Sequence, residues 1–292
     1  MKSALRLRRF SKFGQNYSGL LASAGLVALL SLAQGDAAWA ATAPSLGSTS
    51  PYGVVSSTFT NSNTAPQTII NGAVCFTTGP TTPPLTITGA TVTPCPPQTG
   101  LDQGFALAAL LGQPCTSLGA GAIALDSVII GSNPPGTIPP GCYSSGGAMN
   151  VTLSTTVTLN GAGVYVFRPG GALNTGANST VVLAGGACAS DVFWAPVGAT
   201  TLGANAALSP TPTFVGNILD AAGITIGHFA NLTGRALAFG GTVTTDANTI
   251  TVPSCAAFVA GGSIPTLAEW AIVMLAALLA IAGFAAMRKR LS

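Results

Sequence analysis

Residues 213–230 read TFVGNILDAAGITIGHFA, and residues 231–248 follow directly as NLTGRALAFGGTVTTDAN. Laid over one another without a gap, the two stretches place apolar residues on apolar residues and glycines on glycines. The matched pairs are Phe214 with Leu232, Gly216 with Gly234, Leu219 with Leu237, and Gly223 with Gly241. A repeat of this kind is typical of a solenoid, in which successive coils stack and equivalent side chains form rows.

Two earlier coils carry the same pattern. Residues 167–179 match residues 194–206, with the Gly-Ala-Asn that starts at Gly176 lying on the one that starts at Gly203. We place Gly227 and Thr245 next in the series, so the steps from 176 to 203, to 227 and to 245 are 27, 24 and 18 residues. A unit of 18 residues has room for three short strands and three corners, but not for a crossover helix. We therefore predict an all-β fold of stacked parallel strands, a β-helix. A β-sandwich is the alternative, and the gapless match disfavours it.

The composition limits the classes of partner. The chain has 292 residues, of which only 6% are charged, and most basic residues lie at the two ends. Between residues 41 and 263 there are two basic residues, Arg168 and Arg235, and five aspartates, which gives a net charge of −3. A surface without lysine is poorly suited to neutralise a phosphate backbone, so we expect no nucleic-acid partner.

Residues 1–40 have the pattern of a secretory signal peptide. A basic start is followed by an apolar run over about residues 19–33, and then by Ala38, Trp39 and Ala40, where small residues suit signal peptidase. We expect an N-terminal helix that is removed by cleavage after Ala40. A retained N-terminal anchor is the alternative.

A second apolar run lies near the C-terminus. Residues 271–287 are apolar and are followed by the basic residues 288–290. A helix of this length spans about 25 Å, which suits a transmembrane helix in a slightly thinned bilayer. The basic tail would stay cytoplasmic and the preceding domain would lie outside. Residues 256–263 are expected to be a linker, and residues 264–292 to form a C-terminal unit of short motif, helix and basic tail.

Six cysteines in an exported domain favour disulfides over metal ligation. The spacing alone leaves many connectivities open. Our hypothesis is sequential pairing, namely Cys75 with Cys95, Cys115 with Cys142, and Cys188 with Cys255. We expect no metal and no cofactor, because no CxxC or paired histidine is present.

One helix is expected before the C-terminus. Residues 101–111, LDQGFALAALL, place Leu101, Phe105, Ala108 and Leu111 on a shared apolar face. A single helix in a solenoid must lie against its side or cap one end.

Several stretches resemble the bacterial and fungal ice-binding protein family. They are LGSTSPYGVVSSTFTNS (46–62), PPGCYSS (139–145), TVTLNGAGVYVF (156–167), DVFWAPVGATTLG (191–203) and TFVGNILDAAGITIGHFANLTGRALA (213–238). The resemblance implies an irregular right-handed parallel β-helix with one long helix packed alongside, and we place this domain at residues 46–255.

The C-terminal unit resembles the tripartite sorting signals that begin with an IPTL motif in Gram-negative bacteria. The residues that carry this resemblance are Ile264, Pro265, Thr266, Leu267, Glu269 and Trp270. The following Ala271 stands where these signals usually have glycine. The resemblance implies processing by an exosortase-type membrane enzyme, and a plain tail anchor is the alternative.

Several ice-binding members of the family hold ice on a flat β face with a Thr, then Ala or Gly, any residue, then Thr or Asn. This chain matches the pattern at residues 88–91 and 175–178. It departs at residues 202–205 and 226–229, and residues 245–248 keep the ends of the pattern but sit one residue out of register. Such a face must be flat and uncharged to hold ordered water, so Leu202, Phe229 and Asp246 are unfavourable within it.

A second set of candidates comes from the strands. If Phe214, Leu232 and Ile250 point inward, the threonines and asparagine on either side point outward. Solubility and β-propensity explain any one of them, but the set favours binding. The full set of ice-binding candidates is Thr88, Thr91, Thr175, Asn178, Thr201, Asn205, Thr213, Asn231, Thr233, Thr249 and Thr251.

The sequence predicts no enzyme, because catalysis would need clustered acids, bases or ligands. The domain has one histidine, His228, and no glutamate. We therefore expect an exported ice-binding protein, membrane-anchored through its C-terminus and sorted to the surface of a Gram-negative cell. The alternative is a structural or adhesive surface protein that binds polysaccharide or other cells.

Overall fold

Short parallel strands stack into coils in the computed structural model, which describes residues 40–62, 66–80, 86–207, 213–254 and Leu275. Residues 39–260 form one compact unit. The expected signal peptide, linker and C-terminal helix lie outside the described residues. Within the described ranges, no helix is both long enough and apolar enough to cross a membrane.

Each coil contributes strands to three walls. Strands of the first wall, in spatial order, are β5 (Thr91–Val92), β3 (Ala73–Thr78), β1 (Tyr52–Asn61), β19 (Leu232–Thr245), β17 (Phe214–Leu219), β15 (Val192–Trp194), β12 (Tyr165–Pro169), β9 (Gly141–Ser145) and β6 (Thr116–Gly119). The second wall consists of β7 (Ile123–Ala124), β10 (Met149–Val151), β13 (Leu173–Thr175), β16 (Thr200–Leu202), β18 (Ile224–Ile226) and the ends of β19 and β1.

The third wall closes the coils. It consists of β8 (Thr137–Ile138), β11 (Thr156–Asn160), β14 (Thr180–Ala184), the starts of β17 and β19, β20 (Thr249–Thr251), β2 (Ile69–Asn71) and β4 (Thr86–Ile87). Three short 3-10 helices lie at corners: η2 (Gly47–Thr49), η3 (Leu125–Ser127) and η4 (Ala189–Asp191). Over residues 40–254, as far as they are described, the fold is the predicted irregular parallel β-helix with one α-helix, and the strands pair in parallel.

The repeat found in the sequence is confirmed as a stacking register. Phe214 pairs with Leu232, Gly216 with Gly234, and Leu219 with Leu237. The register slips by one residue where β18 meets β19, because Ile224 pairs with Val243. At the following corner, Phe229 N donates to Asp246 O. In a parallel ladder this bond pairs Phe229 with Ala247, so the spacing returns to 18 residues. Matching side chains therefore form rows, as in the inward column of Tyr143, Phe167 and Trp194, whose rings lie 5.7 and 4.1 Å apart.

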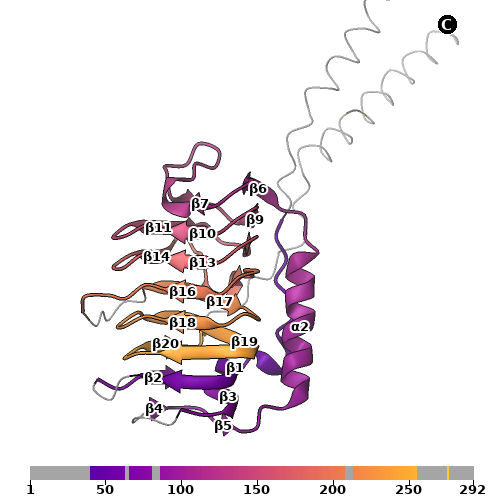
Figure 1. Cartoon of the computed structure of the whole chain (residues 1–292). Coiled ribbons are helices and arrows are strands. Elements are labelled where there is room, and N and C mark those ends of the chain that lie inside the picture. The colour runs from indigo at the N-terminus through magenta and orange to yellow at the C-terminus, as the bar shows by residue number, and fades with distance from the viewer. Residues whose placement is uncertain (1–39, 63–65, 81–85, 208–212, 255–274, 276–292) are drawn as a thin grey trace, which may run out of the picture. The chain divides into compact units, whose positions relative to one another are not determined.

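The order of coils in space differs from their order in the chain. Strands β1 to β5 form one block, α2 (Pro97–Leu111) follows, and β6 to β20 form a second block. The blocks meet where β1 pairs with β19, for example Val54 with Ala236 and Thr60 with Thr244. Figure 1 shows indigo β1 beside orange β19, and α2 running along the stack, across the direction of the strands. The helix carries the chain back along the stack, over about 22 Å at 1.5 Å per residue.

The shared apolar face of the helix is exposed. Leu101 and Phe105 are 56% and 70% exposed, and Leu111 is exposed as well. The helix begins earlier than expected, and Thr99, Gln103, Ala106 and Leu110 are the residues that face the first wall. Gln103 sets this orientation because its Oε1 accepts from Phe239 N at 3.0 Å, while Ala106 and Leu110 pack among apolar side chains of the wall.

Two of the expected disulfides are confirmed. Cys75 is bonded to Cys95 and Cys115 to Cys142. They lie on the two sides of α2 and tie each end of the helix to the first wall. Cys188 is also disulfide-bonded, and Cys255, its expected partner, lies outside the described residues.

Candidate functional site

Only two of the three walls have an accessible outer face. The outer face of the first wall is covered by α2, with Val55, Val166 and Leu237 fully buried beneath it. A surface that contacts a large ligand must therefore lie on the second or the third wall.

The second wall carries one continuous outward row. Successive members pair strand to strand, and each lies between two inward residues, as Thr225 lies between buried Ile224 and Ile226. The row, which we call the central row, is Asn150, Asn174, Thr201, Thr225, Thr244 and Thr60. All of its members are uncharged, and Thr201 and Thr225 are the most exposed.

Small residues keep the second wall flat on both sides of the central row. Two positions before Asn150, Asn174 and Thr201 stand Ala148, Ala172 and Ala199. Two positions before Thr244 and Thr60 stand Thr242 and Thr58. After the row, at the corner, stand Gly203 and Gly227, and a Cβ on either would meet backbone atoms of the preceding coil. A Cβ on Gly203 would lie 2.5 Å from Gly176 C, and one on Gly227 would lie 2.7 Å from Leu202 O. Glycine therefore allows the coils to close up at this edge.

The third wall is Thr-rich as well, but its outward rows are interrupted. Thr213 and Asn231, predicted as candidates for ice contact, are only 7% and 6% exposed. Thr213 Oγ1 accepts from Asn231 N at 2.8 Å, and Asn231 Oδ1 accepts from Thr249 N at 2.8 Å. These side chains hold neighbouring coils together. Thr233, Thr249 and Thr251 are half-buried and face outward.

The Thr-Gly-Ala-Asn match at residues 175–178 lies at a corner rather than across a wall. Thr175 Oγ1 accepts from Gly203 N, and Asn178 Oδ1 accepts from Ala206 N, both at 2.8 Å. In the next coil Asn205 Nδ2 donates to Phe229 O at 3.2 Å. The polar groups of this corner therefore join one coil to the next. The other match, with Thr88 and Thr91, lies far away at the β4–β5 end of the stack.

The three unfavourable residues lie outside the central row. Leu202 is buried in the core. Phe229 and Asp246 stand at the corner between the second and third walls, where His228 bridges them. Its ring lies 3.7 Å from that of Phe229, and its Nδ1 lies 3.0 Å from Asp246 Oδ1. The departures from the family pattern thus do not interrupt the flat part of the wall.

One buried carboxylate supports the other edge of the second wall. Asp220 Oδ2 accepts from Thr200 Oγ1 at 2.7 Å, and its Oδ1 accepts from Ala222 N at 2.8 Å and Gly223 N at 3.3 Å. Burial raises the pKa of this carboxyl, and these hydrogen bonds oppose the shift. Asp220 therefore ties β16 to the corner that leads into β18.

The basic side chains of the described domain are used internally. Arg235 is buried, which lowers its pKa, and it donates to Ser50 O and to Asn217 Oδ1. Arg168 Nη1 donates to Gln113 O at the end of α2. Neither lies on the second wall, so the central row has no basic neighbour to attract a polyanion.

Comparison with known proteins decides the family. A sequence model for proteins described as ice-binding-like matches residues 52–251, more than half of the chain. The chain belongs to the ice-binding-like family. A second model, the IPTL-CTERM motif, matches residues 263–289 and includes the predicted sorting residues.

Relatives agree with this assignment. An ice-binding protein of Flavobacterium frigoris is 35% identical over 136 residues, which cover 46% of this chain and 47% of the relative. An ice-binding protein of a Colwellia species is 32% identical over 139 residues, covering 46% of this chain and 51% of the relative. The chain thus matches about half the length of these curated relatives.

Solved structures show the same fold over more of the chain. An ice-binding protein from an Antarctic biological consortium superposes with a TM-score of 0.61 at 26% identity, covering 74% of this chain and 93% of that one. One from the ascomycete Antarctomyces psychrotrophicus gives 0.58 at 27% identity, covering 73% and 100%.

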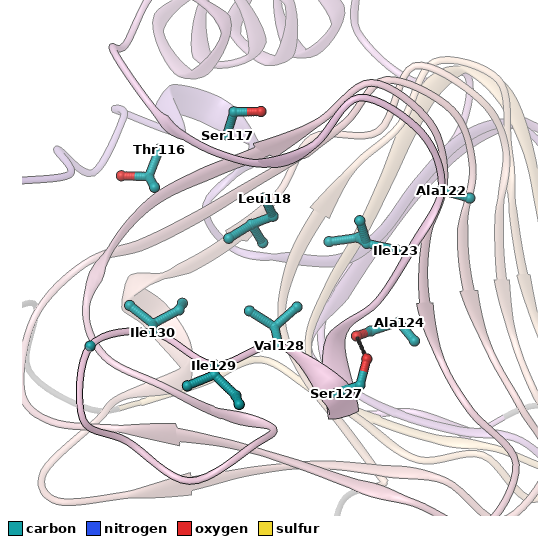
Figure 2. A pocket seen from close by; sticks show the side chains of 11 residues that line it. Thr116, Ser117, Leu118, Ala122, Ile123, Ala124, Ser127, Val128, Ile129 and Ile130 are labelled. Carbon is teal, nitrogen blue, oxygen red and sulfur yellow. Dashed lines mark hydrogen bonds between the residues drawn. The ribbon is translucent and has the colours of Figure 1, made fainter.

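A pocket of about 670 Å³ lies at one end of this ice-binding-like domain. Figure 2 shows Leu118, Ile123, Val128 and Ile130 around it. None of its lining residues is ionisable, and the described part of the chain has no group of three His, Cys, Asp or Glu that could hold a metal.

Sequence reasoning found one member of the central row, Thr201, and missed the other five. Each missed residue stands between two residues that point inward, such as Met149 and Val151 on either side of Asn150. Alternation combined with the repeat register could have found those in β10, β13 and β18. Thr60 could not be placed this way, because its neighbour Thr244 is far away in the sequence.

Proposed function

We propose that this protein is an exported ice-binding protein, held at the cell surface, that contacts ice through the outer face of its second wall. The observation that carries the proposal is the central row, in which uncharged threonine and asparagine side chains follow one another on six parallel strands. The named relatives and the family support ice as the ligand.

The geometry of the wall suits ordered water. Parallel strands place successive members of the row about 4.8 Å apart, so their hydroxyl and amide groups repeat at a fixed spacing. A threonine hydroxyl can donate one hydrogen bond and accept two, while its methyl group limits where neighbouring water can lie. Water bridged to such a row is held almost as favourably as by direct bonds, and it can join the lattice of a crystal.

Export and tethering rest on the two ends of the chain. The IPTL-CTERM match supports surface sorting, in which an exosortase-type enzyme processes the C-terminal motif. Mass spectrometry of the mature protein tests this part: loss of the residues after the motif supports sorting, whereas a complete C-terminus supports a plain membrane anchor.

Ice binding is tested by thermal hysteresis and by inhibition of ice recrystallisation. The full chain, purified in detergent, should be active relative to a detergent-only control. Thr225→Tyr places a large ring on the exposed centre of the row and should lower both activities several-fold. Thr233→Tyr places the same ring on the third wall and serves as the matched control.

The paired variants also identify the face. If Thr233→Tyr removes activity and Thr225→Tyr does not, the third wall is the contact surface. Complete inactivity of the unmodified chain at high concentration would reject ice binding and leave the adhesive alternative, which no specific observation favours. Circular dichroism melts of both variants exclude unfolding as the cause.

A further inference from the structure

The central row is not chemically uniform. Its lower part consists of four stacked threonines, Thr201, Thr225, Thr244 and Thr60, and its upper part consists of Asn150 and Asn174. Within the lower part, Thr244 and Thr60 lie on the two sides of the seam, which is our name for the pairing of β1 with β19. We propose that ice contact is confined to this threonine part and that the asparagine part does not contribute. This inference rests on the proposed function.

The threonines at the seam form a two-dimensional array. Beside Thr244 and Thr60, and paired with each other in the same register, stand Thr242 and Thr58. Thr60 Oγ1 donates to Thr244 Oγ1 at 2.8 Å. Neighbouring methyl and hydroxyl groups therefore repeat along the stack and also along the strands. Such an array can order a patch of water, whereas a single row orders only a line.

The asparagines are occupied by one another. Asn174 Nδ2 donates to Asn150 Oδ1, and Asn150 Nδ2 donates to Ile123 O, both at 3.1 Å. These bonds occupy amide groups of both asparagines, and asparagine has no methyl group. The row beside them consists of alanines, Ala148 and Ala172, which offer no hydrogen bond.

The corner beyond Asn150 differs from the corners below it. Two residues after Asn174, Thr201 and Thr225 stand Gly176, Gly203 and Gly227, which do not project from the wall. Beyond Asn150 the corner carries Leu153, which is 66% exposed. A protruding leucine beside the upper strands separates that part of the wall from a flat crystal surface.

The seam itself is firmly held. Ser57 Oγ donates to Gly241 O at 2.8 Å, and Thr245 Oγ1 donates to Asn61 Oδ1 at 2.9 Å. Thr245 and Asn61 are buried, and Thr68 Oγ1 also donates to Asn61 Oδ1 at 2.7 Å. These bonds fix β1 against β19, so the threonines contributed by the two blocks keep a constant spacing.

The experiment compares equal substitutions in the two parts, in the full chain purified in detergent. Thr225→Tyr and Thr60→Tyr should each lower thermal hysteresis several-fold, while Asn150→Tyr should leave it within the scatter of the unmodified protein. If Thr60→Tyr does not fold, Thr201→Tyr replaces it. If Asn150→Tyr does not fold, Ala148→Tyr replaces it. Circular dichroism melts identify variants that do not fold.

Each outcome has a separate meaning. Loss of activity in the threonine variants alone supports the inference. An equal loss in Asn150→Tyr, with an unchanged melting temperature, overturns it and extends the contact over the whole wall, while ice binding by the second wall stands. Unchanged activity in every variant overturns it and moves the site to another wall. An inactive unmodified chain rejects the proposed function itself.

Discussion

The first and second walls share a backbone but have opposite surfaces. Strands β1 and β19 run through both walls, so the same two strands present Val55 and Leu237 outward in one wall and Thr60 and Thr244 outward in the other. The apolar side chains are covered by α2, and the threonines remain accessible. The comparison shows that the chemistry of the outward side chains, rather than the strand pairing, decides whether a wall packs against another part of the chain or faces solvent.

The largest effect is expected under the helix. Leu110 is fully buried between α2 and the first wall, so Leu110→Ala should lower the free energy of unfolding by about 2–5 kcal/mol through lost contacts and the cavity left behind. Chemical denaturation followed by circular dichroism measures this change.

The next residue provides the control. Leu111 is exposed, so Leu111→Ala should change the free energy of unfolding by only about 0.5 kcal/mol. Thermal hysteresis of Leu110→Ala, measured well below its melting temperature, should match that of the unmodified protein. Lost hysteresis in a folded Leu110→Ala variant would contradict the separation of a stabilising wall from a binding wall.

A smaller effect is expected at the edge of the second wall. The Cβ of Gly203→Ala would lie 2.5 Å from both Gly176 C and Thr175 O, so the coils must separate locally. We expect a loss of about 1–3 kcal/mol in the free energy of unfolding, together with lower ice activity, because the wall is no longer flat.

Gly240 is the matched control for this substitution. A Cβ there meets no atom within 4 Å, so Gly240→Ala should be neutral or should stabilise the fold by about 0.5 kcal/mol, since the unfolded chain loses freedom. Equal stability of the two alanine variants would show that close packing of the coils does not depend on Gly203.

An effect of similar size on stability is expected at the corner between the first and second walls. Asp220→Ala leaves Thr200 Oγ1 and the amides of Ala222 and Gly223 without their acceptor, which should cost about 1–3 kcal/mol. Asp220→Asn keeps an acceptor oxygen and should cost less.

Asp220 also predicts a pH dependence. Burial raises the pKa of its carboxyl above the ordinary value of 3.8, so the folded protein binds this proton more tightly than the unfolded chain does. The contribution of Asp220 to stability is therefore fully present below pH 3.8 and is lost as the pH rises through the folded pKa. As the pH falls, the melting temperature of the unmodified protein should therefore rise relative to that of Asp220→Asn. A difference independent of pH would show that the pKa of Asp220 is not raised by folding.

Much of the fold was predictable because a solenoid repeats locally. The pairing of Phe214 with Leu232 follows from a gapless alignment of neighbouring stretches, and the two confirmed disulfides join cysteines close in the sequence. The face of α2 was not predictable from apolar periodicity. Gln103 faces the wall because it accepts a hydrogen bond from Phe239, which lies 136 residues away.

The candidate site was predictable only in part, because some of its residues are brought together by strands far apart in the sequence. Thr201 and Thr225 lie in coils whose register can be read from the repeat. Thr60 and Thr58 join them only because β1 pairs with β19, and no local pattern predicts a pairing between residues 184 apart. The burial of Thr213 and Asn231 likewise depends on hydrogen bonds between coils, so an outward position in a strand did not mean an exposed side chain.

The pairing of β1 with β19 has a consequence for biogenesis. A ribosome makes β1 among the first strands and β19 among the last, so one edge of β1 has no native partner until nearly the whole domain has been synthesised. An unpaired strand edge readily recruits other chains, and contacts of such long range form slowly. The N-terminal coils therefore need protection from aggregation while the later coils are made. The two blocks of the domain join only when β19 pairs with β1.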